Sequence, residues 1–199
     1  MKTVVSFLAS TVLATGAFGQ GVVTFASTVL NPTPYIYFAD GVTRFTGTQY
    51  AVQLYYSTTT PESLAAHTAA PNRFRLPGSS AAGTWSTAGG ATRTLTGGGV
   101  GVPVWMQLRV WDLDQFPIYE AAVDGGGITA TSAIFQYTQR LSRFPSPTDT
   151  YMTDAAGNPL FASFIIPVVP EPSVALLVIP AMALLAWQYR RRRFISSRN

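Results

Sequence analysis

The chain has 199 residues, which suffices for one domain of ordinary size with a hydrophobic core, together with targeting segments. Its formal net charge is +4, but five of its arginines lie in the last ten residues and Lys2 lies near the start. The chain between these ends contains seven arginines and all nine acidic residues, so no basic surface remains for nucleic acid. The absence of cysteine from the sequence excludes disulfides, thiolate metal sites, cysteine nucleophiles and a lipid anchor on an N-terminal cysteine.

Residues 1–19 have the pattern of a secretory signal peptide. Lys2 supplies the positive start, residues 4–14 are apolar, and Ala17-Phe18-Gly19 is a small-x-small cleavage site. We therefore expect export and cleavage before Gln20. The alternative, a buried N-terminal helix, is disfavoured because the glycines that follow would weaken it.

Residues 20–168 are predicted to form one all-β ectodomain, an antiparallel β-sandwich or jelly roll. Short runs rich in aromatic and β-branched residues alternate with glycine-rich turns, and this pattern is typical of those folds. In the run 104–111 the even positions are apolar, whereas Gln107 and Arg109 are polar, as expected for a half-buried strand. The predicted strands are 22–25, 50–56, 104–111, 133–137 and 161–166. Only Pro61 to His67 is predicted to be helical.

His67 is the only histidine in the sequence, so any catalytic triad or histidine-containing metal site would have to include it. Its position in the predicted short helix favours an exposed helical histidine over a catalytic one. No general base is therefore assigned.

Asp112 and Asp114 are the weak candidates for a metal site. They alternate at the end of a strand, and Glu120 and Asp124 follow closely, so the four carboxylates could surround a hard cation such as Ca²⁺. The spacing of a calcium loop is missing, and aspartates at strand ends more often cap turns. Asp112 paired with Glu120 could in principle cleave a glycoside, although the spacing does not require it. We expect no metal and no cofactor.

The sequence contains 12 Phe, 9 Tyr and 4 Trp, which makes a sugar-stacking face conceivable. Trp105 belongs to the odd, outward set of its strand. Core packing is the commoner role of large rings, so a carbohydrate-binding module is kept as the alternative function and a secreted hydrolase as a more remote one.

Three elements follow one another at the C-terminus: Pro170-Glu171-Pro172, an uncharged segment over 173–189, and Arg190, Arg191, Arg192 and Arg193. The two prolines favour an extended backbone of the kind that proteases bind. Within this tail, 169–199, we expect residues 173–189 to form one transmembrane helix. Seventeen helical residues would span about 25 Å, which is short for a hydrocarbon core of about 30 Å but sufficient with interfacial aromatic residues. The arginines would then lie in the cytoplasm. The alternative is a buried core helix with a basic end.

This tail resembles the PEP-CTERM sorting signal, and the order of strands around 21–25, 53–55 and 108–112 is similar to a recurring group of ectodomains of that family. The resemblance implies that exosortase, an integral-membrane cysteine protease, is a partner and processes the chain at or near Pro170-Glu171-Pro172. It further implies an inner-membrane intermediate and a mature protein at the cell surface or outside the cell, with a non-enzymatic structural or adhesive role linked to extracellular polysaccharide.

Overall fold

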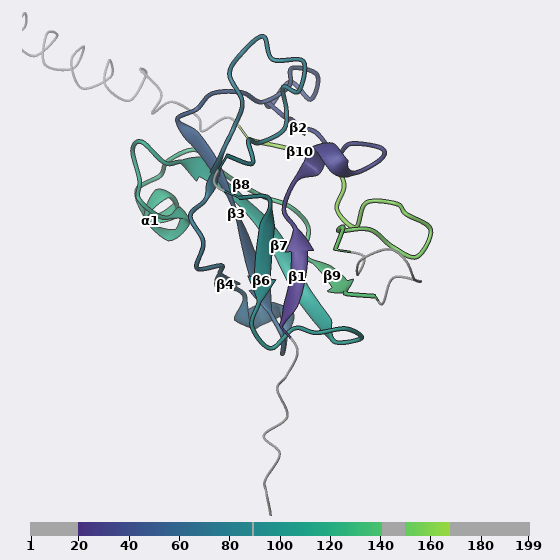
Figure 1. Cartoon of the computed structure of the whole chain (residues 1–199). Helices are drawn as coiled ribbons and strands as arrows, with labels where there is room; N and C mark the ends of the chain where they lie inside the picture. The colour runs from purple at the N-terminus through teal and green to yellow at the C-terminus, as the bar shows by residue number, and fades with distance from the viewer. Residues whose placement is uncertain (1–19, 89, 141–149, 168–199) are drawn as a thin grey trace, which may run out of the picture.

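The computed structural model describes residues 20–88, 90–140 and 150–167 (Figure 1). The predicted signal peptide and the whole C-terminal tail, including Pro170, Glu171, Pro172 and Arg190 to Arg193, lie outside the described residues. Within those three ranges, no helix is both long enough and apolar enough to cross a membrane.

A six-stranded sheet is the largest element. Its centre is the antiparallel pair of β3 (Tyr50–Ser57) and β7 (Pro103–Asp112), which runs the full length of β3. Four shorter strands extend this pair, two beside β3 and two beside β7: β4 (Ala65–Ala66), β5 (Asn72–Arg73), β8 (Thr129–Thr131) and β9 (Phe135–Thr138). Strands dominate the described residues and helices are short, which confirms the prediction of an all-β chain.

One face of this sheet carries the hydrophobic core. The even positions of β7, from Val104 to Val110, are buried as the alternation predicted. Across the central pair Leu54 lies opposite Leu108 and Val52 opposite Val110, and these apolar cross-strand pairs stabilise the register. A slip of one residue would turn the apolar set toward solvent.

A second, smaller layer covers this face. The antiparallel pair of β1 (Gly21–Thr24) and β6 (Thr92–Leu95) crosses the large sheet, as Figure 1 shows, and Val23 and Leu95 belong to the same buried cluster as Leu54 and Leu108. At one end of the molecule, β2 (Ile36–Tyr37) pairs with β10 (Phe164–Ile165). That pair is parallel, so the expected antiparallel arrangement does not hold for every strand.

The helix predicted over Pro61 to His67 is wrong. The structure has a single 3₁₀ turn, η2 (Pro61–Ser63), followed by β4. The hydroxyl of Ser57 lies 2.8 Å from that of Ser63, and such local side-chain bonds compete with helical ones. β4 also gains backbone hydrogen bonds by pairing with β3, which a helix over these residues would lose. A further 3₁₀ turn, η1 (Ser27–Val29), follows β1.

The only α-helix in the described part of the chain, α1 (Tyr119–Asp124), was not predicted. It covers the outer face of the sheet at the end of β7. The ring of Trp111 meets that of Tyr119 edge to face at 6.4 Å between centroids, and the Trp111 indole N–H donates to the carbonyl of Phe116 at 3.0 Å. Trp111 is therefore fully buried although it belongs to the odd positions of β7.

Candidate functional site

An open groove lies beside the loop that follows β5. The loop begins with a β-turn in which the Ser79 amide donates to the carbonyl of Leu76 at 3.3 Å. Pro77 occupies the second position of this turn, and Gly78 occupies the third with a φ of 83°. A proline followed by a glycine of positive φ is the signature of a type II turn. This turn fixes the backbone conformation of Pro77 and Gly78, which line the groove.

The turn is tied to the rest of the fold on two sides. The Gly47 amide donates to the carbonyl of Arg75 at 3.0 Å, and the Gly83 amide donates to that of Phe45 at 3.0 Å. Gly83 has a φ of 82°, and a Cβ there would lie 3.0 Å from the Tyr35 ring. Glycine is therefore required where the loop passes this tyrosine.

Because side chains alternate between the two sides of an extended backbone, two arginines point away from the core. Phe74 is 1% exposed and bridges to Trp85, so its neighbours Arg73 and Arg75 project from the other side of the extended backbone. Arg73 bonds to the Asp114 carboxylate at 2.8 Å and to the carbonyl of Thr48. Arg75 instead lines the groove.

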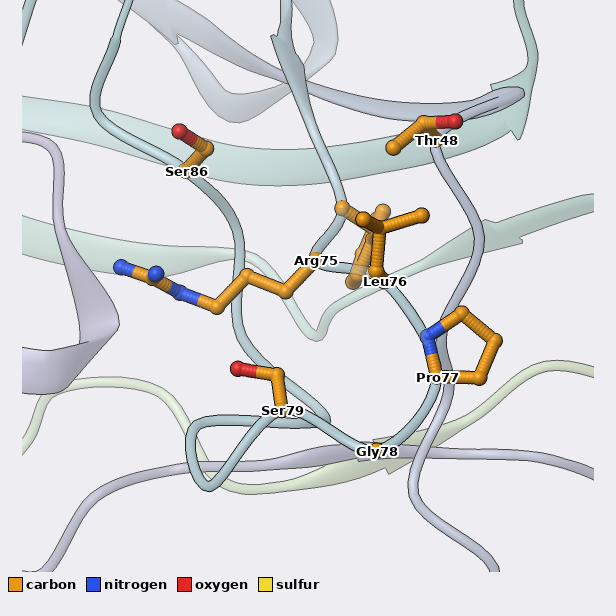
Figure 2. Close-up of a pocket in the computed structure, with 8 residues that line it drawn as sticks. Thr48, Arg75, Leu76, Pro77, Gly78, Ser79 and Ser86 are labelled. Carbon is orange, nitrogen blue, oxygen red and sulfur yellow. The ribbon is translucent and has the colours of Figure 1, made fainter.

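The lining of the groove combines one cation, three hydroxyls and apolar surface around a volume of about 530 Å³. Figure 2 shows the Arg75 side chain extending between Ser79 and Ser86. We name this feature the Arg75 groove; its lining residues are Thr48, Phe74, Arg75, Leu76, Pro77, Gly78, Ser79 and Ser86. No acidic residue belongs to this lining, so the groove favours ligands that accept hydrogen bonds.

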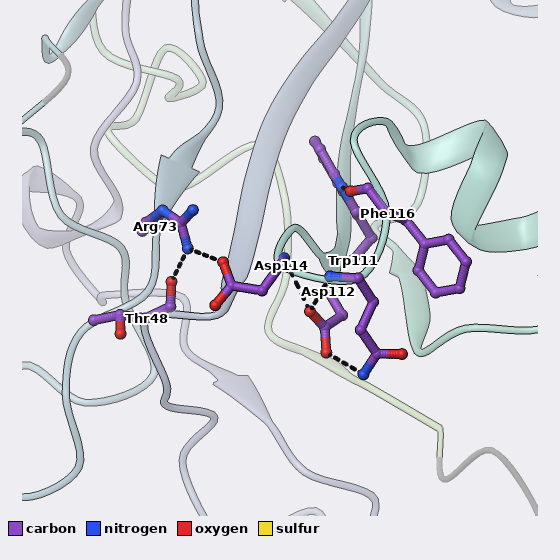
Figure 3. A network of polar contacts seen from close by, with 7 residues as sticks. Thr48, Arg73, Trp111, Asp112, Asp114 and Phe116 are labelled. Atoms are coloured by element: carbon purple, nitrogen blue, oxygen red, sulfur yellow. Dashed lines mark hydrogen bonds and ion pairs between the residues drawn. The ribbon is translucent and has the colours of Figure 1, made fainter.

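The candidate metal residues Asp112 and Asp114 have other roles in the structure. Oδ1 of Asp112 accepts hydrogen bonds from the amides of Asp114 and Gln115, both at 3.1 Å, and Oδ2 accepts one from the Gln115 side-chain amide at 2.9 Å (Figure 3). Asp112 thus caps the turn after β7, which was the commoner alternative. Asp114 is paired with Arg73. In the described ranges no three potential metal ligands gather into one group.

Glu120 lies in a different cluster on the outer face of the sheet. Its carboxylate accepts hydrogen bonds from the Tyr55 hydroxyl at 3.0 Å and from Arg109 at 3.1 Å. The Arg109 guanidinium also lies over the Tyr55 ring, 4.0 Å from its centroid. Burial and donation to Glu120 raise the pKa of the Tyr55 hydroxyl, which stays protonated. Asp112 and Glu120 are each held by different partners and do not form a shared acid pair.

His67 is buried and follows a strand, contrary to the prediction of an exposed helical residue. Its Nδ1 accepts from the Ala69 amide at 2.9 Å. Nε2, 3.0 Å from the carbonyl of Thr94, must then be the protonated nitrogen that donates. Both nitrogens of a neutral imidazole are engaged by the backbone. His67 therefore stabilises the packing of β4 near β6 and has no nitrogen left for catalysis.

We predict that His67 makes the stability of the protein depend on pH. Burial, reinforced by the nearby Arg93 charge, lowers the pKa of His67, so the unfolded chain binds a proton more readily than the folded one. The stabilisation is complete above the ordinary histidine pKa of about 6.5 and is lost as the pH falls through the lowered pKa of the folded protein.

Urea unfolding of the wild-type protein and His67→Gln between about pH 7.5 and pH 5 measures this effect. The wild-type midpoint should fall across this interval, and the variant should show a smaller change because the chain has no other histidine. Equal pH dependence of the two proteins would contradict the assignment.

Large aromatic side chains mostly fill the core. Trp85 and Trp111 are buried, whereas Trp105 is partly exposed on the outward set of β7, as predicted. No broad stacking platform is built from these rings. The groove was missed by sequence reasoning because Arg75 gives no signal of its own. The one available sign was Pro77-Gly78, which follows an arginine-flanked phenylalanine after one intervening leucine.

No protein family, curated protein or solved structure compared with the chain matches it.

Proposed function

We propose that the protein is an exported, non-enzymatic surface or matrix protein that carries a PEP-CTERM sorting signal processed by exosortase. The observation that carries this proposal is the order of the tail in the sequence: Pro170-Glu171-Pro172, an uncharged stretch over 173–189, and the four arginines 190–193, behind a predicted signal peptide. In this topology the β-rich domain faces outward and the arginines remain in the cytoplasm until cleavage.

The chemistry of the described residues supports a role without catalysis. The histidine nitrogens are bonded to the backbone, and Asp112 and Glu120 hold separate structural partners. We further propose that residues 20–168 form a small β-sandwich, in which β1 and β6 with the loops around them make the second layer. Packing of Val23 and Leu95 against the core face of the large sheet supports this view.

Processing of the tail is testable with a C-terminal epitope tag. In a host that contains exosortase, the wild-type protein should lose the tag and leave the inner membrane. Replacement of Pro170, Glu171 and Pro172 by alanine should leave most of the protein uncleaved, because the stiff extended segment is lost. Alanine at Val168 and Val169, just before the motif, is the matched control and should be processed normally.

Mass spectrometry of the mature C-terminus locates the cleaved bond. The proposal fails if the wild-type protein keeps its arginine tail, stays in the inner membrane and is unaffected by deletion of the exosortase.

The Arg75 groove favours polysaccharide binding as a second function of the same exported domain. Its donor-rich, open lining is the observation in favour.

A further inference from the structure

Arg75 differs from the other arginines of the described residues because its guanidinium has no partner there. Its Nε is buried without a hydrogen bond, and no described residue forms an ion pair with it. The others all have partners: Arg44 lies over the Tyr35 ring, Arg73 pairs with Asp114, Arg93 binds carbonyls, Arg109 pairs with Glu120, and Arg140 bonds to Thr153. A partly buried cation without an anion is unfavourable, so an anionic ligand would stabilise it.

Two serines add donors on either side of this guanidinium. Ser79 Oγ accepts from the Ala81 amide at 3.3 Å, and Ser86 Oγ accepts from the Ala88 amide at 3.2 Å. Each oxygen is thereby used as an acceptor, and each hydroxyl keeps its proton for a ligand. The groove therefore presents a planar fork of N–H groups flanked by two O–H donors, which matches the oxygens of a carboxylate.

We propose that the Arg75 groove binds a carboxylate-bearing sugar, a uronic acid residue of an acidic polysaccharide. Arg75 would hold the carboxylate, Ser79 and Ser86 would bond to carboxylate or ring oxygens, and the exposed Leu76 and Pro77 would contact the apolar face of the sugar. The inference deepens the proposed function, because it gives the exported domain a ligand class.

The backbone of the groove favours a saccharide over an acidic peptide. One common mode of peptide binding adds an extended segment to free main-chain groups of the protein, and acidic motifs otherwise bind to clusters of several arginines. Here the Arg75 amide donates to Thr84, the Arg75 carbonyl accepts from Gly47, and the Ser86 amide donates to the carbonyl of Arg73. Side-chain hydroxyls and the guanidinium are what the groove offers, and they suit a hydroxyl-rich ligand.

The decisive experiment compares two forms of one ligand on the full-length protein in detergent. A short oligogalacturonate and its methyl-esterified form differ in charge but share the sugar skeleton. Isothermal titration should show binding of the acid form and at least about tenfold weaker binding of the ester, since a hydrogen-bonded charge contributes roughly that factor. Raising the salt concentration should weaken binding of the acid form.

Substitutions of Arg75 test whether this difference in affinity between the acid and ester forms arises in the groove. Arg75→Gln should lower affinity for the acid form about tenfold or more, and Arg75→Lys should lose less because it keeps the charge without the planar fork. Arg44→Gln, which removes an exposed arginine outside the groove, should bind like the wild type. Circular dichroism of each variant checks that it is folded.

Equal binding of the acid and ester forms, or no binding of the acid form, would overturn the proposal without any variant. Full affinity in folded Arg75→Gln would overturn the site. Tighter binding of a polyglutamate peptide than of oligogalacturonate would replace the saccharide with an acidic protein partner. None of these outcomes affects cleavage of the tagged tail, so failure of this inference is distinguishable from failure of the proposed sorting.

Discussion

Replacing Arg93 with alanine should lower the free energy of unfolding by about 3–5 kcal/mol. Arg93 is 2% exposed, and its guanidinium donates to the carbonyls of Gly90 and Thr92 at 2.9 Å, to that of Ala70 at 3.3 Å, and to Asn72 Oδ1 at 2.9 Å. The alanine variant would leave these acceptors unpaired and a cavity beside them. Of these acceptors only Asn72 belongs to a buried residue, and leaving its Oδ1 unpaired costs about 1–3 kcal/mol, to which the lost packing of the guanidinium and the cavity add.

Arg93 also joins parts of the chain that are distant in sequence. It extends from β6 to the segment before β5 and lies over the Phe25 ring, 5.0 Å from its centroid. Burial lowers its pKa, but an arginine stays protonated at any physiological pH. The carbonyl dipoles around it take the place of a carboxylate, so the charge is stabilised without an ion pair.

Urea unfolding followed by tryptophan fluorescence measures the effect. Arg93→Lys should be intermediate, because it keeps the charge but supplies one ammonium in place of the planar fork. Arg44→Ala is the matched control on an exposed arginine, and a change within about 1 kcal/mol is expected there. If Arg93→Ala and Arg44→Ala were equally stable, the carbonyl-bound arginine would not contribute to the fold as inferred.

Trp85→Ala should destabilise the protein by a similar amount, about 3–5 kcal/mol. The indole is 1% exposed, its N–H donates to the carbonyl of Phe25 at 3.0 Å, and its ring lies 5.1 Å from that of Phe25 and 6.4 Å from that of Phe161. Truncation removes the largest side chain of this region and leaves a buried carbonyl without a donor.

Trp85→Phe separates these two losses in part, because it keeps one aromatic ring while removing the donor and part of the buried ring volume; we expect about 1–2 kcal/mol, less than for Trp85→Ala. Trp105→Ala is the control on a partly exposed tryptophan and should cost less than Trp85→Ala. Trp85 bridges to Phe74 and precedes Ser86, so Trp85→Ala should also weaken ligand binding in the Arg75 groove. A stable Trp85→Ala protein with an unchanged groove would refute this coupling.

The sequence predicts the structure correctly where the alternation of apolar residues matches the side of the strand that the core covers. In β7 the apolar residues at even positions from Val104 to Val110 face one core, so simple alternation predicted the strand and its orientation. At Trp111 the pattern fails because α1 covers the other face of the sheet at the end of β7. Tyr119–Asp124 is only six residues long, too short for a helical period to be recognised.

In the candidate site, too, local interactions were predictable from the sequence and long-range ones were not. Of the two interpretations of Asp112, metal ligand and turn cap, the turn cap is confirmed. It was predictable because an aspartate bonds to amides two and three residues ahead by local geometry alone. The burial of His67 depends on its hydrogen bond to Thr94. Arg75 lacks an acidic partner because other arginines pair with Asp114 and Glu120. These are long-range pairings, and a single sequence does not specify them.

The β2 and β10 pair determines how the domain would respond to a pulling force on its C-terminal end. Only two residue pairs join these strands, supplemented by the Ile166 amide bonded to Tyr37 at 2.9 Å. A tension transmitted through Pro167 meets this short ladder before it reaches the long β3 and β7 pairing. The last strand would therefore detach first, while the sheet that supports the Arg75 groove stays folded.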